Sequence, residues 1–209
     1  MDTVGAVRAA AQYADAALEA LHALLAGSTL DAEQHAAHGY AWIATAVAAL
    51  EALAAWHERL NSAGEAGEAD GLVVSIALGE TLAQLIGGLP MGQNEIVRPL
   101  ALGLEEHAQA LAANPSVRAF LVDGNTPTAR ARLVALLCEG ATVSDSLGDA
   151  MLDTIRDQYR RFTNERIVPQ AHGWHLANAL IPDDLVRAMA DMGPFGVCIP
   201  EQFGGLGLG

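Results

Sequence analysis

Residues 30–61, LDAEQHAAHGYAWIATAVAALEALAAWHERLN, decide the fold class of this chain. Large apolar side chains recur there every three or four residues, which is the spacing of one face of an α-helix. Alanine, the residue with the highest helix propensity, fills most of the positions between them. The stretch therefore predicts a long helix with one apolar face, formed by Tyr40, Ile43, Val47, Leu50, Leu53, Ala54 and Leu60.

The same spacing predicts helices on both sides of this stretch. Residues 4–26 repeat apolar side chains at helical intervals, and Ser28 or Thr29 is placed to cap the helix that follows. Residues 69–86 form a third apolar segment, which ends at Gly87-Gly88-Leu89-Pro90. Glycines destabilise a helix and proline cannot continue one, so we expect the third helix to stop there.

Between residues 91 and 145 the predicted helices are shorter, because prolines and turn-forming residues interrupt the pattern. Thr126-Pro127 is a favourable helix start, since threonine caps a helix and proline suits its first position. Strand-forming residues are sparse throughout the chain, so we expect an all-α fold. The expected ranges of the short helices are 93–98, 105–113, 115–122 and 127–139.

A domain boundary is expected near residues 139–146, where small turn-forming residues cluster and the composition changes from alanine-rich to charged. Residues 1–145 then form a helical bundle, and residues 146–209 form a second helical domain. Helices of the second domain are expected at about 146–166 and 183–192, with a short piece after Pro169 and an apolar turn at 192–200.

The charge balance narrows the classes of partner. The formal net charge is −14 at pH 7, and an acidic chain repels phosphate backbones and anionic lipid headgroups. We therefore expect no nucleic acid and no membrane as a partner. Cys138 and Cys198 lie far apart without a CxxC spacing, which argues against a zinc site and fits a reducing, cytoplasmic location. We expect neither a signal peptide nor a transmembrane helix.

The histidines do not predict a metal site. His35 and His38 share a helix face, and His172 and His175 lie close together, but neither pair has the further ligands that zinc requires. We expect ordinary polar surface residues at these positions, and no metal ligand in the chain.

Paired carboxylates do not predict catalysis either. The pairs Glu105-Glu106 and Asp183-Asp184 stand at predicted helix starts, where negative charge complements the helix dipole. Residues 79–96 are expected to form a tight corner between two helices, in which polar residues satisfy exposed backbone groups.

The glycine-rich end, residues 204–209, resembles part of a dinucleotide-binding loop in composition only. That fingerprint requires a buried strand before it, whereas prolines and predicted helices precede it here. We expect a packing turn, in which glycines allow two backbone segments to approach closely.

Residues 146–209 are similar to the opening of acyl-CoA dehydrogenases. The resemblance rests on the helix at 155–166 followed by Val168-Pro169, on the turn at 192–201, and on Phe203-Gly204-Gly205-Leu206-Gly207-Leu208. Residues 1–145 resemble the long helical extension of the methylsuccinyl-CoA dehydrogenase group within that family. This second resemblance rests on residues 38–45, Gly79-Glu80 and residues 87–96.

The resemblance implies a flavin-dependent oxidation. In this family a glutamate removes the α-proton of an acyl-CoA substrate while N5 of FAD accepts the β-hydride, and electron-transfer flavoprotein takes the electrons. The product from methylsuccinyl-CoA is mesaconyl-CoA, and a homo-oligomer is expected. The family's flavin, CoA and base positions follow the region matched here, so we assign no catalytic or cofactor-binding residue and expect residues 1–209 to be inactive alone. Glu201 belongs to the loop motif and is not the base. The alternative is a stand-alone helical interaction module without catalysis.

Overall fold

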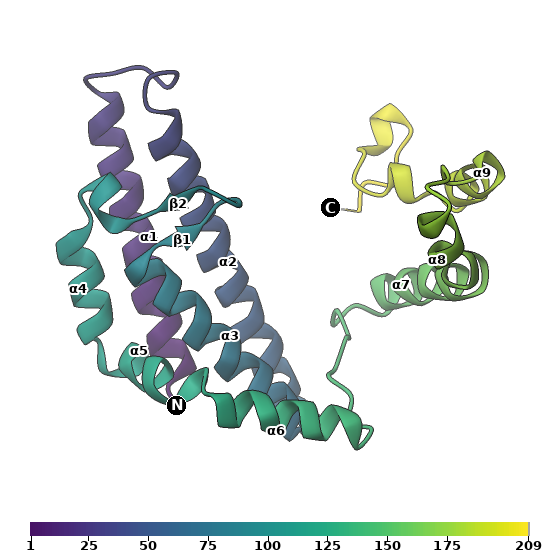
Figure 1. The fold of residues 1–209 in the computed structure, drawn as a ribbon, viewed down its shortest axis with the longest axis horizontal. Helices are drawn as coiled ribbons and strands as arrows, with labels where there is room; N and C mark the ends of the chain where they lie inside the picture. The colour runs from purple at the N-terminus through teal and green to yellow at the C-terminus, as the bar shows by residue number, and fades with distance from the viewer. Residues whose placement is uncertain (209) are drawn as a thin grey trace. The chain divides into compact units, whose positions relative to one another are not determined.

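The computed structural model describes residues 1–208 (Figure 1). These residues fall into two compact units, residues 1–145 and residues 146–208. The fold is all-α, as the sequence predicts, apart from one small two-stranded sheet in the first unit.

Three long helices form the body of the first unit. Helices α1 (Thr3–Leu25), α2 (Gln34–Ala63) and α3 (Glu68–Gly87) run side by side, with short loops between them (Figure 1). The start of α2 differs from the prediction, because residues 30–33 form turns. Thr29 Oγ1 accepts a hydrogen bond from Ala32 N at 3.3 Å within these turns, so Thr29 stabilises the loop and does not cap α2.

The connection after α3 is a small antiparallel hairpin, so the predicted helix at 93–98 and the helix–helix corner are wrong. Strands β1 (Leu89–Pro90) and β2 (Ile96–Val97) pair with Leu89 opposite Val97. Val97 is buried against α2 at Gly39, where an added Cβ would lie 2.5 Å from Val97 Cγ2. Burial of an apolar side chain on the bundle thus overrides the local polar pattern of this segment.

Short helices complete the first unit: a 3₁₀ turn η1 (Pro99–Leu102), α4 (Glu105–Ala113), α5 (Pro115–Ala119), a π-type turn η2 (Phe120–Gly124) and α6 (Pro127–Cys138). Thr126 caps α6 as predicted, because its Oγ1 accepts a hydrogen bond from Ala129 N at 3.1 Å. Asn114 Oδ1 caps α5 in the same way, accepting from Ser116 N at 3.0 Å. The predicted helix at 115–122 is divided, since η2 widens the backbone after residue 119.

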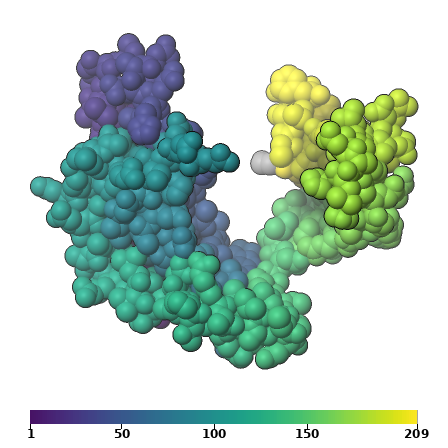
Figure 2. All heavy atoms as spheres, viewed as in Figure 1, coloured from purple at the N-terminus to yellow at the C-terminus, as the bar shows by residue number. Residues whose placement is uncertain are grey.

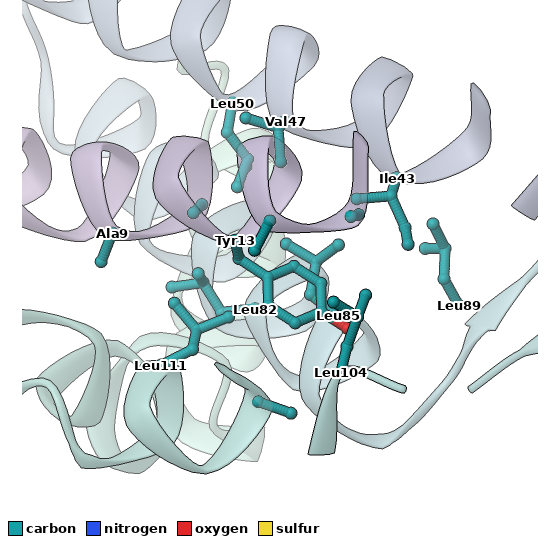
Figure 3. Close-up of a cluster of buried hydrophobic side chains, with 14 of the residues drawn as sticks. Ala9, Tyr13, Ile43, Val47, Leu50, Leu82, Leu85, Leu89, Leu104 and Leu111 are labelled. Carbon is teal, nitrogen blue, oxygen red and sulfur yellow. The ribbon is translucent and has the colours of Figure 1, made fainter. Parts of the chain in front are cut away.

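The core of the first unit lies where α1, α2, α3 and α4 meet (Figure 3). Helix α1 presents small side chains such as Ala6, Ala10 and Ala17, which are fully buried and allow its neighbours to approach closely. Burial raises the pKa of Tyr13 to about 12. The largest fully buried side chains are Phe120, Leu78, Leu82, Leu85, Leu104 and Val117.

The second unit consists of shorter elements: α7 (Ala150–Phe162), a π-type turn η3 (Thr163–Ile167), α8 (Val168–Leu176), α9 (Asp183–Asp191) and 3₁₀ turns η4 (Pro194–Gly196) and η5 (Glu201–Phe203). Helix α7 begins later than predicted, because Asp149 Oδ1 accepts hydrogen bonds from Met151 N and Leu152 N and so ends the preceding loop. Tyr159 joins α7 to the end of α9, donating from its hydroxyl to Met192 O at 3.2 Å.

Helices α2 and α3 are each long and apolar enough to cross a membrane by length and composition, with mean hydropathies of 1.3 and 1.4 over their most apolar windows. From the sequence we expect no such segment. The difference arises because the many alanines raise the mean hydropathy of a helical segment even where a charged residue interrupts it. Core helices of soluble proteins meet the same criterion, and α3 supplies buried Val74, Leu78, Leu82 and Leu85 to the bundle.

Candidate functional site

The second unit exposes large apolar side chains over much of its surface. Among its described residues only Leu185 is buried, whereas the other buried apolar residues all belong to the first unit. Phe203 and Phe195 are 74% and 63% exposed, and Ile199 and Leu206 lie open beside them in the chain. These four residues are called the C-terminal apolar surface; their segment is the yellow region of Figure 2.

The glycine-rich end is the element that presents this surface. Gly204 and Gly207 have φ values of 84° and 61°, which side chains of other residues rarely adopt. A Cβ on Gly205 would lie 2.0 Å from Ile199 O, so only glycine allows the two backbone segments to touch. Three backbone hydrogen bonds of 2.8–2.9 Å close the turn, from Leu206 N to Gly196 O, from Gly207 N to Ile199 O and from Leu208 N to Val197 O.

This geometry confirms the predicted packing turn. The amides of Leu206, Gly207 and Leu208 donate to backbone carbonyls, so they are not available to a pyrophosphate group. The described part of the turn therefore does not fit the phosphates of FAD or of another dinucleotide. Glu201, in the first turn of η5, is exposed.

The Gly79-Glu80 pair lies where α3 crosses the π-type turn η2. A Cβ on Gly79 would lie 2.8 Å from both Asn125 N and Phe120 O, and one on Gly124 would lie 2.6 Å from Ser75 O. Two glycines from segments far apart in sequence thus allow the backbones to meet. The motif lies inside the helix predicted at 69–86, and the close crossing that it forms was not predicted.

Glu80 connects this crossing to α6. Its Oε2 accepts hydrogen bonds from Asn125 Nδ2 at 2.5 Å and from Arg130 at 3.1 Å, while its Oε1 accepts from Gln84 Nε2 at 3.0 Å. Arg130 Nε also donates to Asn125 Oδ1 at 2.6 Å. Both oxygens of Glu80 are engaged by protein donors, so the cluster is suited to positioning α6 and not to chemistry.

A second arginine holds α6 at another point of α3. Arg132 donates two hydrogen bonds to the Glu68 carboxylate, at 2.8 and 2.7 Å. This bidentate pairing lowers the pKa of Glu68 and raises that of Arg132. Helix α6 has no fully buried residue among those described, and these two ion pairs link its exposed side to α3.

The outer face of α2 is a second uncovered apolar surface, formed by Ala41, Trp42, Thr45, Ala48, Ala49 and Ala52, all exposed. Trp42 is held on this face by His38, whose Nε2 accepts a hydrogen bond from Trp42 Nε1 at 2.9 Å. Small residues along one helix face allow close approach of another apolar element. The pairing of His38 with Trp42 was not predicted; their four-residue spacing on one helix face is the signal that could have indicated it.

The remaining predicted positions lie as follows. Glu105 and Glu106 occupy the first turn of α4, and Asp183 and Asp184 occupy the first turn of α9, as expected for charges that complement a helix dipole. His35 is exposed at the start of α2, and His172 and His175 are exposed on α8. Within residues 1–208 no group of three or more His, Cys, Asp or Glu residues is arranged to hold a metal ion.

Buried Asp70 was missed by the sequence analysis. It is 3% exposed, and its Oδ2 accepts a hydrogen bond from Gly67 N at 2.8 Å at the start of α3, which is the half of a capping box that the acid supplies, because Gly67 has no side chain for the other half. A signal was present, because an acid three residues after a helix-capping position is typical of such a box.

Comparisons with known proteins place the chain in a family. Residues 150–209 match the sequence profile described as "Acyl-CoA dehydrogenase, N-terminal domain". The chain is 47% identical over 187 residues to (2S)-methylsuccinyl-CoA dehydrogenase from Cereibacter sphaeroides, a match that covers 88% of this chain and 33% of that protein. It therefore spans about a third of that relative's length.

Shorter matches point to the same family. The chain is 39% identical over 57 residues to glutaryl-CoA dehydrogenase from Desulfococcus multivorans, covering 27% of this chain and 15% of the relative. It is 46% identical over 54 residues to benzylmalonyl-CoA dehydrogenase from Aromatoleum aromaticum, covering 26% and 14%. Together these similarities relate the chain to the acyl-CoA dehydrogenase family, whose N-terminal domain matches residues 150–209.

Proposed function

We propose that this chain is the N-terminal portion of an FAD-dependent enzyme that oxidises (2S)-methylsuccinyl-CoA to mesaconyl-CoA in the cytoplasm and passes electrons to electron-transfer flavoprotein. The observation that carries this proposal is the extent of the match to (2S)-methylsuccinyl-CoA dehydrogenase. A match of 187 residues cannot fit within residues 146–209, so it includes most of the helical extension. The glutaryl-CoA and benzylmalonyl-CoA relatives match only 57 and 54 residues.

In this proposal residues 1–208 contribute structure and not catalytic groups. The C-terminal apolar surface packs against the part of the polypeptide that corresponds to the other two-thirds of the relative. Exposed Phe203 and Phe195 would stay in water otherwise, and burying one aromatic side chain contributes about 1.5–3 kcal/mol. FAD binds to that other part, since the described glycine turn has no amide available for its phosphates.

The extension, residues 1–145, packs against the dehydrogenase core or a neighbouring subunit of a homo-oligomer. The outer face of α2 supports this role, because only 22% of the most apolar window of that helix is buried within the unit. Its small side chains suit contact with another apolar surface.

The test is expression of the complete reading frame that contains these residues, followed by an assay with three substrates. We expect a flavin absorbance spectrum and preferential oxidation of (2S)-methylsuccinyl-CoA over glutaryl-CoA and benzylmalonyl-CoA. Residues 1–209 alone should bind no flavin and oxidise none of the three. Equal or faster oxidation of another substrate would refute the substrate assignment, and a complete reading frame without flavin would favour a helical interaction module.

A further inference from the structure

The outward face of α2 carries a regular repeat. Exposed side chains, most of them alanine, recur there at alternating spacings of three and four residues, which is the heptad spacing of helices that pair lengthwise. We call these residues the α2 seam: His38, Ala41, Thr45, Ala48, Ala52 and Ala55. Buried Ile43, Val47 and Leu50 lie on the opposite side of the same helix, so the seam is separate from the core of the first unit.

The seam allows a second helix to approach closely. Helices whose contact residues are small pack with their axes about 8 Å apart, the short end of the usual range. Thr45 Oγ1 donates a hydrogen bond to Ala41 O at 2.7 Å, and Trp42 Nε1, beside the seam, donates to His38 Nε2 at 2.9 Å. Because both donors have partners within α2, covering them with an apolar surface leaves neither hydrogen bond unmade.

The distribution of charge indicates which helix the seam accepts. Within residues 34–57 the only Asp, Glu, Lys or Arg is Glu51, whereas Arg59 continues the seam spacing beyond Ala55. The loop before α2 carries Asp31 and Glu33. An antiparallel second copy of α2 would bring Arg59 of each copy close to these two acids of the other. A parallel second copy would instead place the two Arg59 guanidinium groups against each other, and like charges repel.

We propose that two copies of this chain pair through the α2 seam, as antiparallel helices related by a twofold axis between Thr45 and Ala48. In this register Ala41 of one copy opposes Ala52 of the other, and Thr45 opposes Ala48. The same residues serve both copies, as a twofold interface requires. The inference rests on the packing role proposed above for the extension and names its partner, while the substrate assignment does not enter it.

The first test is sedimentation equilibrium of residues 1–209, for which we expect a dimer. Ala48→Glu should raise the dissociation constant at least about tenfold, because it places two unpaired carboxylates beside the twofold axis. Ala83→Glu is the matched control, since Ala83 is an exposed alanine of α3 outside the seam, and it should leave the constant unchanged. Phe203→Ser, on the C-terminal apolar surface, should leave it unchanged as well. Circular dichroism of each variant verifies that its helices are intact.

Disulfide trapping tests the direction of pairing, in a chain whose exposed Cys138 and Cys198 are replaced by serine. A mixture of Ala41→Cys and Ala52→Cys chains should form a mixed disulfide, because the two Cα atoms would lie within the reach of about 7 Å that a disulfide allows. Ala41→Cys alone should not cross-link, because its two copies would lie about 16 Å apart along the antiparallel helices.

Three results would overturn the proposal. One is a monomer at every concentration up to about 0.1 mM, far above the micromolar dissociation constants of weak specific interfaces. Another is a dimer that Ala48→Glu does not weaken, or that Phe203→Ser dissociates instead. The third is a disulfide between two Ala41→Cys chains, which would indicate parallel helices. All three concern association alone, so they leave the assay with the three acyl-CoA substrates to decide the proposed oxidation separately.

Discussion

Replacing Gly79 by alanine should destabilise the first unit, although the same change elsewhere in α3 should stabilise it. The added methyl group would lie 2.8 Å from Asn125 N and from Phe120 O. Both atoms belong to the backbone of the segment that crosses α3. The steric clash can therefore be relieved only if this segment moves away from α3. Forcing an extra carbon into a packed contact costs about 1–3 kcal/mol, and crowding by backbone on two sides puts Gly79→Ala toward the upper part of that range.

Helix propensity acts in the opposite direction. Alanine is favoured over glycine inside a helix by about 1 kcal/mol, so the net effect of Gly79→Ala should be a loss of roughly 1–2 kcal/mol. Gly71→Ala is the matched control, because Gly71 lies in the same helix and nothing would come within 4 Å of its added Cβ. It should raise stability by up to about 1 kcal/mol.

The assay is urea denaturation of residues 1–209 followed by helical circular dichroism, with both variants and the wild type measured together. The urea concentration at the unfolding midpoint should be highest for Gly71→Ala, intermediate for the wild type and lowest for Gly79→Ala. The dependence of the unfolding free energy on urea concentration should be the same for all three. If Gly79→Ala were as stable as Gly71→Ala, the close crossing of α3 and η2 would not exist in solution and the role assigned to this glycine would be refuted.

Four more outcomes are expected. Burial raises the pKa of Tyr13 to about 12 in the folded state, so the stability that the protonated Tyr13 contributes is complete below the ordinary pKa near 10 and is lost as the pH rises through about 12. Tyr13→Phe should therefore weaken the loss of stability at alkaline pH, measured by unfolding as a function of pH. The hydrogen bond from the Leu147 amide lowers the pKa of Asp153 in the folded state, so the stability that its carboxylate contributes is present above the ordinary pKa of 3.8 and is lost as the pH falls through the folded-state pKa. Asp153→Asn should therefore reduce the pH dependence of amide hydrogen exchange in α7 at acidic pH. Phe203→Ser should leave the melting of residues 1–209 nearly unchanged, since Phe203 is 74% exposed, but should lower the melting temperature of the complete protein; equal effects in both would argue against burial of the C-terminal apolar surface. Deletion of residues 1–140 from the complete protein should lower its melting temperature or change its oligomeric state, and light scattering with calorimetry that detects neither would contradict a packing role for the extension.

The long helices could be predicted because their apolar faces repeat over many turns, so that local pattern and tertiary burial agree. In α2 the predicted stripe includes Ile43, Val47 and Leu50, all of which are buried. The cap at Thr126 could be predicted for the same reason, since it depends only on neighbouring residues.

The hairpin at 89–97 could not be predicted from its own residues. Each strand has two residues, too few for a periodic signal, and the pairing depends on Val97 entering the space left by Gly39 on another helix. The π-type turn η2 is a similar case, because its wider backbone follows from the contact of Gly124 with Ser75 in α3.

Some features of the candidate site could likewise be predicted from the sequence, and others could not. The glycine turn near residue 205 could be predicted, because its motif is contiguous and the backbone demands glycine. The C-terminal apolar surface could be predicted only in part, since the apolar turn at 192–200 is visible in the sequence, but the sequence does not reveal whether a partner for Phe195 and Ile199 lies in the same unit. Asp70 could not be paired with Ser144 because 74 residues separate them.

Asp70 also determines where the extension can be separated from the rest of the protein. In a chain cut after residue 140, Asp70 Oδ1 would lose the hydrogen bond that it accepts from Ser144 N, although the side chain would still lie at the start of α3. A chain that continues through Ser144 would keep this bond as well as the one from Gly67 N to Asp70 Oδ2. The shortest form of the extension that keeps these bonds therefore continues beyond its last helix, α6, which ends at Cys138. In any exchange of this extension between related proteins, Asp70 and the segment that it binds need to be transferred together.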